Sequence, residues 1–220
     1  MTNIIKKNNI FLFLPYVIKR ADKHHSLFYL ISSTLYKIRK MNIINSGSVV
    51  NFNGMKADKL VEYIINTHHT YIKDALSTFN VHSKTIVKID SALYPEVIAI
   101  YQLSQELKEL LEQHLSFEEY ILYPYIKKLI ENSEESSDNL LENPINKIRE
   151  ENINISNVFK KLRKLSGNYV ASVNSSPALK LCYAQLFDLE QDVNKHTFLE
   201  ENILFSKLNE LEKRKTNSKK

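Results

Sequence analysis

The sequence has few of the residues that break helices or cross-link a chain. Its 220 residues include three glycines, five prolines, one cysteine and no tryptophan. A single cysteine, Cys182, excludes an internal disulfide, and a reducing compartment is the default for such a chain. Cys182 falls on an apolar stripe, so we expect it to be buried. Alternating Val/Thr runs typical of β-strands are also missing, which favours an all-α fold.

Basic residues outside the first 41 positions are too few to indicate a nucleic-acid-binding surface. The formal net charge is +5, but residues 1–41 contain eight Lys and Arg residues against one Asp. The rest of the chain is therefore mildly acidic, whereas a nucleic-acid-binding domain needs clustered Lys and Arg. We expect no nucleic-acid partner.

Residues 1–55 are predicted to form an N-terminal extension that is either disordered or helical. Its apolar run IFLFLPYVI contains Pro15 and is too short to span a bilayer. No small-residue cleavage site of a signal peptide follows it. We therefore expect a cytoplasmic protein without membrane association. The segment SLFYLISSTLYKI leaves an amphipathic helix on a membrane surface as the alternative.

Four amphipathic stretches are predicted to form helices within residues 56–212. Apolar residues recur at three- and four-residue steps in each stretch. The stretches begin near residues 56, 95, 144 and 177. The first is predicted to end at residue 79, and residues 80–94 to form a connection with at most a short helical turn. Short connections favour an up-down-up-down four-helix bundle, followed by a solvated basic tail at residues 213–220.

Polar residues interrupt the apolar stripes of these helices in a repeated pattern. His114 and Glu118, and likewise His196 and Glu200, have the i, i+4 spacing that places both side chains on one face of a helix. The motifs around them, HLSFEEYILYP and HTFLEENILFS, share this pattern. Burying carboxylates without a partner is costly, and few Lys or Arg share these stripes. We therefore expect a pair of metal ions, as in the carboxylate-bridged di-iron sites of helical bundles.

Oxygen and imidazole ligands without thiolates favour iron, with manganese as the alternative metal. Without a metal, the two pairs would be either solvated on a helix exterior or part of a polar network in the core. Asn152 also projects from an apolar stripe, and Glu151 beside it is a candidate for supporting the site. Glu119 and Glu201 each follow a core glutamate by one residue, so we expect them to be solvated.

Residues 58–206 resemble the iron–sulfur cluster repair di-iron proteins (the Repair of Iron Centres family), which are hemerythrin-like four-helix bundles. The resemblance rests on LVEYIINTHHTYIKDAL, LKELLEQHLSFEEYILYP, NPINKIREEN and HTFLEENILF, in that order. It implies a non-heme, carboxylate-bridged di-iron protein that helps to repair iron–sulfur clusters damaged by oxidative or nitrosative stress. Damaged iron–sulfur proteins are the implied partners, and a homodimer would be unsurprising.

The resemblance also implies the ligands, because five histidines and two glutamates hold the two irons in that family. The matching positions are His69, Asp90, His114, Glu118, Asn152, His196 and Glu200. Helical periodicity alone favours His68 over His69, and His68 remains the alternative. Asp90 and Asn152 stand where the family has histidines. Aspartate is a competent oxygen ligand for iron, whereas asparagine is a weak one.

The altered ligand set leaves the activity open. If the protein is an enzyme, the resemblance implies iron donation or nitric oxide chemistry at the di-iron centre. Two other interpretations remain: a hemerythrin-like module that binds or senses oxygen, nitric oxide or iron without catalysis, and a degenerate bundle that binds no metal. Metal content separates the last of these from the others.

Overall fold

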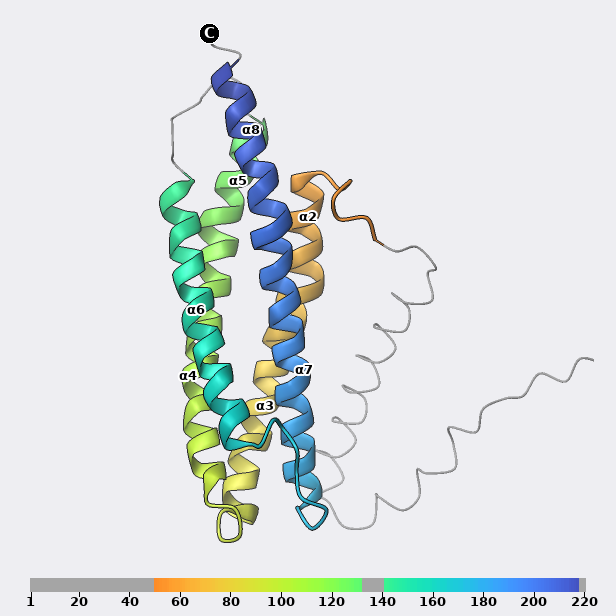
Figure 1. The fold of residues 1–220 in the computed structure, drawn as a ribbon, viewed down its shortest axis with the longest axis vertical. Helices are drawn as coiled ribbons and strands as arrows, with labels where there is room; N and C mark the ends of the chain where they lie inside the picture. Colours follow the sequence, from red (N-terminus) through yellow and green to blue (C-terminus); the bar gives the residue numbers. More distant parts are fainter. Residues whose placement is uncertain (1–49, 132–140, 218–220) are drawn as a thin grey trace, which may run out of the picture. The chain divides into compact units, whose positions relative to one another are not determined.

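Four helical columns run alternately down and up in the computed structural model, which describes residues 50–131 and 141–217 (Figure 1). The predicted up-down-up-down bundle is confirmed. Three columns are each divided by a five-residue π-helical turn, and one is a continuous α-helix. In chain order the elements are α2 (Ala57–Ile64), η2 (Ile65–His69) and α3 (Thr70–Asp90); α4 (Glu96–Phe117), η3 (Glu118–Leu122) and α5 (Tyr123–Glu131); α6 (Glu142–Leu165); and α7 (Pro177–Leu199), η4 (Glu200–Leu204) and α8 (Phe205–Asn217).

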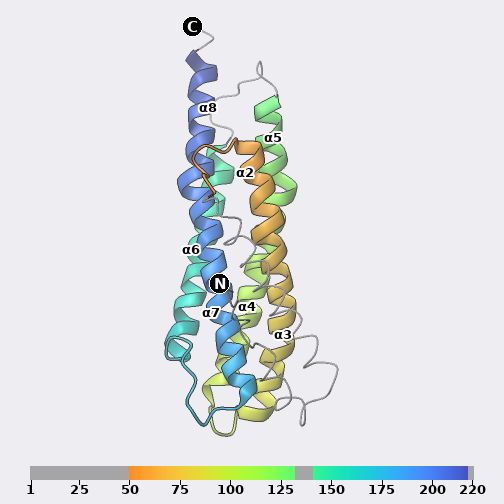
Figure 2. The same ribbon diagram turned by 90° about the vertical axis from the view of Figure 1, so that its right-hand side faces the viewer.

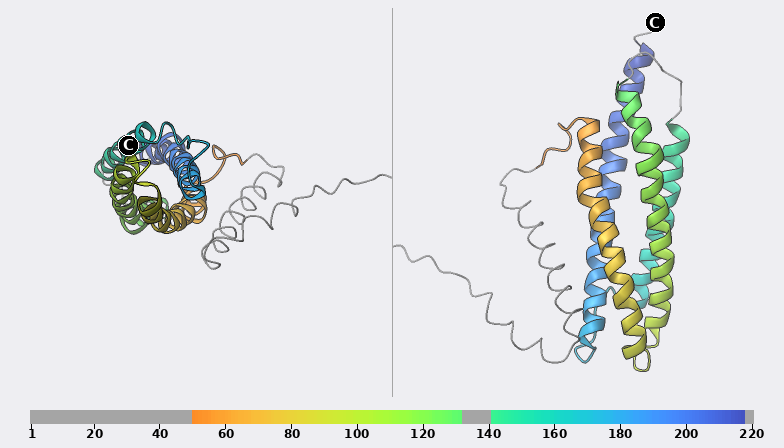
Figure 3. Two further views of the ribbon diagram at one scale, coloured as in Figure 1. Left: turned by 90° about the horizontal axis from the view of Figure 1, so that it is seen from below. Right: turned by 180° about the vertical axis from the view of Figure 1, so that it is seen from behind.

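The columns close into a ring around a common core, as the view along the bundle shows (Figure 3). The helix α4 packs against both α3 and α6, and α3 also packs against α7. Near the connection between α6 and α7, Arg163 and Tyr169 contact the buried carboxylate of Glu190 at 2.7 and 2.8 Å. None of the helices in the described ranges is both long and apolar enough to cross a membrane.

Proline and serine start two of the helices, as their positions predict. Pro95 immediately precedes α4, and Pro177 is the first residue of α7. A proline is tolerated in a first turn because the N–H that it lacks has no helical partner there. Ser176 caps α7, its Oγ accepting a hydrogen bond from the backbone N–H of Leu179 at 3.0 Å.

The core consists of two apolar clusters with a polar layer between them. One cluster lies around α3, α4 and the N-terminal part of α7, and it contains Cys182, which is buried as expected. The other lies around α2, α5 and α8. On α6, Ile148 belongs to the second cluster and Ile155 to the first, so the residues between them stand at the level of the polar layer. Figure 2 shows the columns continuing past this level without a break.

The predicted end of the first helix is wrong. The predicted connection at residues 80–94 is mostly helix, because α3 continues to Asp90. The small polar Ser83 hides this continuation in the sequence, although it lies on the buried face with Phe79 and Ile86. At the other end, α8 extends to Asn217, into the predicted tail. The predictions for residues 1–49, 132–140 and 218–220 lie outside the described residues.

Candidate metal centre

Each π-helical turn begins or ends at a residue predicted to bind metal. The turn η2 ends with His69, η3 begins with Glu118, and η4 begins with Glu200. A π turn adds a residue to the helical repeat and is frequently found at functional sites. The helix α6, which contributes no histidine or glutamate ligand, is continuous over its whole length. The backbone therefore departs from α-helix where the predicted ligands converge.

Glu118 lies at the centre of three buried histidines. Its Oε1 is 2.9 Å from Nε2 of His114, and its Oε2 is 3.2 Å from Nε2 of His69 and 3.4 Å from Nε2 of His196. The carboxylate is fully buried, and each histidine is at most 1 % exposed. A carboxylate with both oxygens directed at imidazoles from three helical columns has the placement of a bridging ligand.

Glu200 contacts a tyrosine and lies farther from its nearest imidazole than Glu118 does. Its Oε2 lies 3.8 Å from Nε2 of His196, and its Oε1 accepts a 2.6 Å hydrogen bond from the hydroxyl of Tyr123. The same hydroxyl is 3.4 Å from Nε2 of His69, and the Tyr123 ring stacks on the imidazole of His69. The sequence did not indicate this tyrosine, whose sole signal is that it follows Glu118 by five residues.

Four polar atoms of the histidine and glutamate ligand candidates lack the hydrogen-bond partners that buried polar atoms require. Both carboxylate oxygens of Glu118, Oε2 of Glu200 and Nε2 of His114 are buried without a hydrogen bond. Nε2 of His114 lies 2.9 Å from Oε1 of Glu118, but the angle between the two groups does not allow a hydrogen bond. Single ligand atoms of His114, Glu118, His196 and Glu200 all lie within 4.8 Å of one another. A cation would satisfy these atoms together, so the residues fit a metal centre.

The charges of the buried histidines and glutamates also indicate a cation-binding site. Burial by itself lowers the pKa of His114. The carboxylates of Glu118, Glu151 and Glu200 outweigh it and raise that pKa to about 10. Burial and the negative charge of Glu118 raise the pKa of Glu200 to about 8. Burial also acts to raise the pKa of Glu118, but His114 and His196 outweigh it and hold that pKa well below its usual range. Without a metal the centre therefore retains extra protons, which a bound cation would displace.

Two carboxylates hold the outer ring nitrogens of two of these histidines. Glu119 Oε1 is 2.7 Å from Nδ1 of His69, and Glu119 is itself bound by Lys73 at 2.7 and 2.8 Å. The expectation that Glu119 is solvated is therefore wrong, because the π turn η3 directs it toward α3. A carboxylate on Nδ1 fixes the orientation of the ring and leaves Nε2 as the atom facing the centre.

The second such carboxylate is Glu151, which the sequence placed beside the site. Its Oε2 lies 3.0 Å from Nδ1 of His114, and Lys147 binds its other oxygen. Glu201, also expected to be solvated, is 25 % exposed and is paired with Arg149 at 3.0 Å. Glu119 and Glu151 thus orient the imidazoles of two different helical columns, and each is paired with a lysine at the surface.

Both adjacent histidines of η2 are buried, but they take different positions. His69 is the one that reaches Glu118, and its Nε2 is 3.1 Å from Nε2 of His196. His68 contacts Asp192 on α7 through Nδ1 at 3.0 Å, and its ring is 6.3 Å from that of His196. The π turn explains why simple periodicity favoured His68: an α-helical wheel does not bring two consecutive residues to the core equally.

Asp90 does not lie at the centre, and its prediction as a ligand is corrected. It is the last of the 21 residues of α3, which begins directly after His69, so the two residues are about 30 Å apart along the axis. Its Oδ2 accepts a 2.7 Å hydrogen bond from Ser176 at the start of α7. The helix is continuous through residues 80–90, where a connection was expected, and it carries Asp90 away from the polar layer.

Asn152 lies at the level of the centre, but the structure records no contact between Asn152 and the other ligand candidates. It lies between Ile148 and Ile155 on α6 and is half-buried. Its Oδ1 accepts a 3.2 Å hydrogen bond from Thr197, the residue after His196, while its Nδ2 is buried without a partner. Its role as a ligand stays a prediction.

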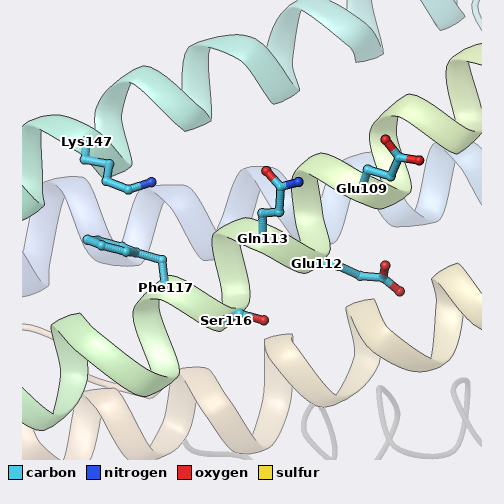
Figure 4. Close-up of a pocket in the computed structure, with 6 residues that line it drawn as sticks. All are labelled: Glu109, Glu112, Gln113, Ser116, Phe117 and Lys147. Atoms are coloured by element: carbon cyan, nitrogen blue, oxygen red, sulfur yellow. The ribbon is translucent and has the colours of Figure 1, made fainter.

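A shallow groove of about 470 Å³ lies on the outer face of α4 and α6 (Figure 4). The residues that line it are Glu109, Glu112, Gln113, Ser116, Phe117 and Lys147. The ammonium of Lys147 lies 4.4 Å from the centre of the Phe117 ring. None of the ligand candidates lines this groove.

The bundle with its layer of imidazoles and carboxylates defines a class of metal-binding helical proteins. Comparison with known families agrees, because the model of the hemerythrin HHE cation binding domain matches residues 61–208. The chain belongs to the hemerythrin family.

Among individual proteins, the chain is similar to the iron-sulfur cluster repair proteins ScdA of staphylococci. It is 22 % identical to that of Staphylococcus epidermidis over 182 residues, which cover 81 % of this chain and 78 % of the relative. It is 21 % identical to that of Staphylococcus haemolyticus over 160 residues, covering 72 % and 70 % of the two chains.

Proposed function

We propose that this protein holds two iron ions in its polar layer and takes part in the repair of iron–sulfur clusters damaged by oxidative or nitrosative stress. The observation that carries the proposal is the convergence of three imidazoles on Glu118, in a layer where both oxygens of Glu118 and Oε2 of Glu200 lack hydrogen-bond partners. The relatives named as iron-sulfur cluster repair proteins support the biological role.

His69, His114 and His196 would hold the metal ions through Nε2, and Glu118 and Glu200 through their carboxylates. Imidazole and oxygen donors without thiolates suit iron, and manganese is the alternative. Bound iron supplies the capacity for electron transfer or for release as a substrate of cluster assembly. The altered ligand set, with Asn152 in place of a family histidine and Asp90 remote from the centre, distinguishes this chain from the pattern of the family.

The protein's own residues act by orienting and protecting the ligands. Glu119 and Glu151 hold the Nδ1 atoms of His69 and His114, which keeps both rings directed at the centre. The two apolar clusters above and below the layer exclude water from it. Low exposure strengthens the electrostatic interactions of the carboxylates with bound cations.

Reactivation of an oxidatively damaged [4Fe–4S] enzyme tests the repair function. The metal-loaded protein should restore activity to the client in stoichiometric or catalytic amounts, and Glu118→Gln should not. The matched control is Glu112→Gln in the same helical column, because Glu112 is exposed and paired with Lys108. A wild-type protein that loads iron but gives no more reactivation than Glu118→Gln would contradict the repair role.

That outcome would favour the second candidate, a module that binds oxygen, nitric oxide or iron without catalysis. The specific observation in its favour is Asn152, which stands where the resemblance implies a histidine and which is a weak ligand for iron. Damaged iron–sulfur proteins as partners, a homodimeric state and a cytoplasmic location are further parts of the proposal.

A further inference from the structure

The two helices that carry the His-Glu pairs repeat one motif but differ at its last position. His114 and Glu118 are followed by Tyr123, whereas His196 and Glu200 are followed by Phe205 at the equivalent position. Both aromatic residues directly follow a π turn and are at most 3 % exposed. The repeat therefore places one hydroxyl in the polar layer and leaves its counterpart without one.

The Tyr123 hydroxyl donates a hydrogen bond to Glu200, which belongs to a different helical column. Its oxygen lies 2.6 Å from Oε1 of Glu200, which leaves Oε2 as the unpartnered oxygen of that carboxylate. Glu118 has no such hydroxyl donor among the described residues, and neither of its oxygens makes a hydrogen bond. The two carboxylates thus present different numbers of free oxygens to the centre.

Further contacts extend the asymmetry to the histidines. The Tyr123 ring stacks on His69 with a centroid distance of 5.6 Å, and its hydroxyl is 3.4 Å from Nε2 of that residue. His114, on the same helix as Tyr123, instead has Glu118 and Glu151 as its neighbours. The hydroxyl therefore lies beside His69 and Glu200.

We propose that Tyr123 is a positioning residue that fixes Glu200 through one oxygen and thereby makes the two metal positions of the centre unequal. The inference rests on the proposed di-metal function. A hydrogen bond to a carboxylate with no competing water restricts its rotation and commits the remaining oxygen to the metal. One metal ion is then held by a preoriented glutamate, and removal of the hydroxyl should weaken that ion alone.

Anaerobic titration of metal-free protein with Co²⁺, followed by visible absorption, measures the two affinities. We expect wild-type protein to bind two Co²⁺ ions in unequal steps. Tyr123→Phe should weaken one step about tenfold and leave the other within a factor of about two, as the loss of one charge-assisted hydrogen bond predicts. The matched control is Tyr120→Phe on the π turn that Tyr123 follows, because Tyr120 is 78 % exposed. It should change neither step.

Circular dichroism of each variant verifies that the bundle is folded. Tyr123→Phe with both affinities of the wild type would overturn the inference and leave the proposed function intact. Two equal steps in wild-type protein would also overturn it, and this result needs no variant. Wild-type protein that binds no Co²⁺ would instead overturn the proposed function, and the inference with it.

Discussion

Nε2 of His69 and Nε2 of His196 lie 3.1 Å apart, although 127 residues separate them in the chain. Two imidazole nitrogens at this distance in an apolar core are unfavourable unless a proton or a cation lies between them. Glu118 lies within 3.4 Å of both nitrogens and supplies the negative charge. This relationship is the basis of the proposed metal centre, and the following predictions test its parts.

Glu118→Gln should remove at least one of the two metal ions per chain. An amide keeps the shape of the side chain but loses the charge and one acceptor oxygen, and Glu118 contacts all three histidines. Elemental analysis after loading and desalting measures the metal content. Glu112→Gln is the control and should retain the wild-type content. Full metal content in Glu118→Gln would show that this carboxylate does not bridge.

Asn152→His should slow the loss of metal to a chelator by about tenfold or more, because it restores an imidazole at the level of the centre. Asp90→His should leave the rate of metal loss unchanged, since Asp90 lies at the far end of α3. It should destabilise the fold by roughly 1 kcal/mol or more through loss of the bond to Ser176. The rate of chelation and the urea midpoint measure the two effects. Faster metal loss in Asp90→His with an intact fold would contradict the placement of Asp90.

The two His-Glu pairs and Asp90 show what the sequence could and could not predict. Spacing of i, i+4 on an apolar stripe was sufficient to place His114, Glu118, His196 and Glu200, because a helix fixes which residues share a face. Asp90 was assigned from the family resemblance alone, and the continuous helix α3 places it far from His69. An alignment assigns a residue to a site only if the intervening secondary structure is also the same.

The contacts around the ligands were the least predictable part. Glu119 was expected to be solvated and Tyr123 was not noticed, yet both contact His69. Each belongs to or directly follows the π turn η3, which an α-helical wheel does not describe. The choice between His68 and His69 depended on the π turn η2 in the same way. Sequence periodicity therefore located the centre but not the side chains that support it.

The metal-free protein should lose stability as the pH rises from about 6.5 to about 9. The pKa of His114 is raised from 6.5 to about 10, and that of Glu200 from 4.5 to about 8. A group whose pKa is higher in the folded state stabilises it below the unfolded pKa, and this contribution is lost as the pH rises through the folded value. Urea denaturation at pH 6.5, 8 and 9 measures the change.

Glu200→Gln provides the matched variant for this pH dependence. Glutamine does not titrate, so the decrease in the urea midpoint between pH 6.5 and 8 should be smaller in this variant than in metal-free wild-type protein. Metal-loaded wild-type protein should show the smallest decrease, because a cation takes the place of the protons. A midpoint that rises with pH in the metal-free protein would contradict the assignment of these protons.

Arg163→Ala should destabilise the bundle by roughly 3 kcal/mol, because it leaves a buried carboxylate without its cation. Glu190 is 3 % exposed and is held by Arg163 and Tyr169. Lys164→Ala on the exposed side of α6 is the control and should change stability by less than about 0.5 kcal/mol. Equal urea midpoints for the two variants would contradict a structural role for the pair. Metal content should be that of the wild type in both.

The metal content of wild-type protein tests the central claim most directly. Protein expressed in iron-replete medium and purified without oxygen should contain close to two iron ions per chain, and after oxidation it should show the near-ultraviolet absorption of an oxo-bridged pair. Circular dichroism confirms that the sample is folded. A folded bundle that contains no metal, and takes up neither iron nor manganese when they are added, would contradict the account.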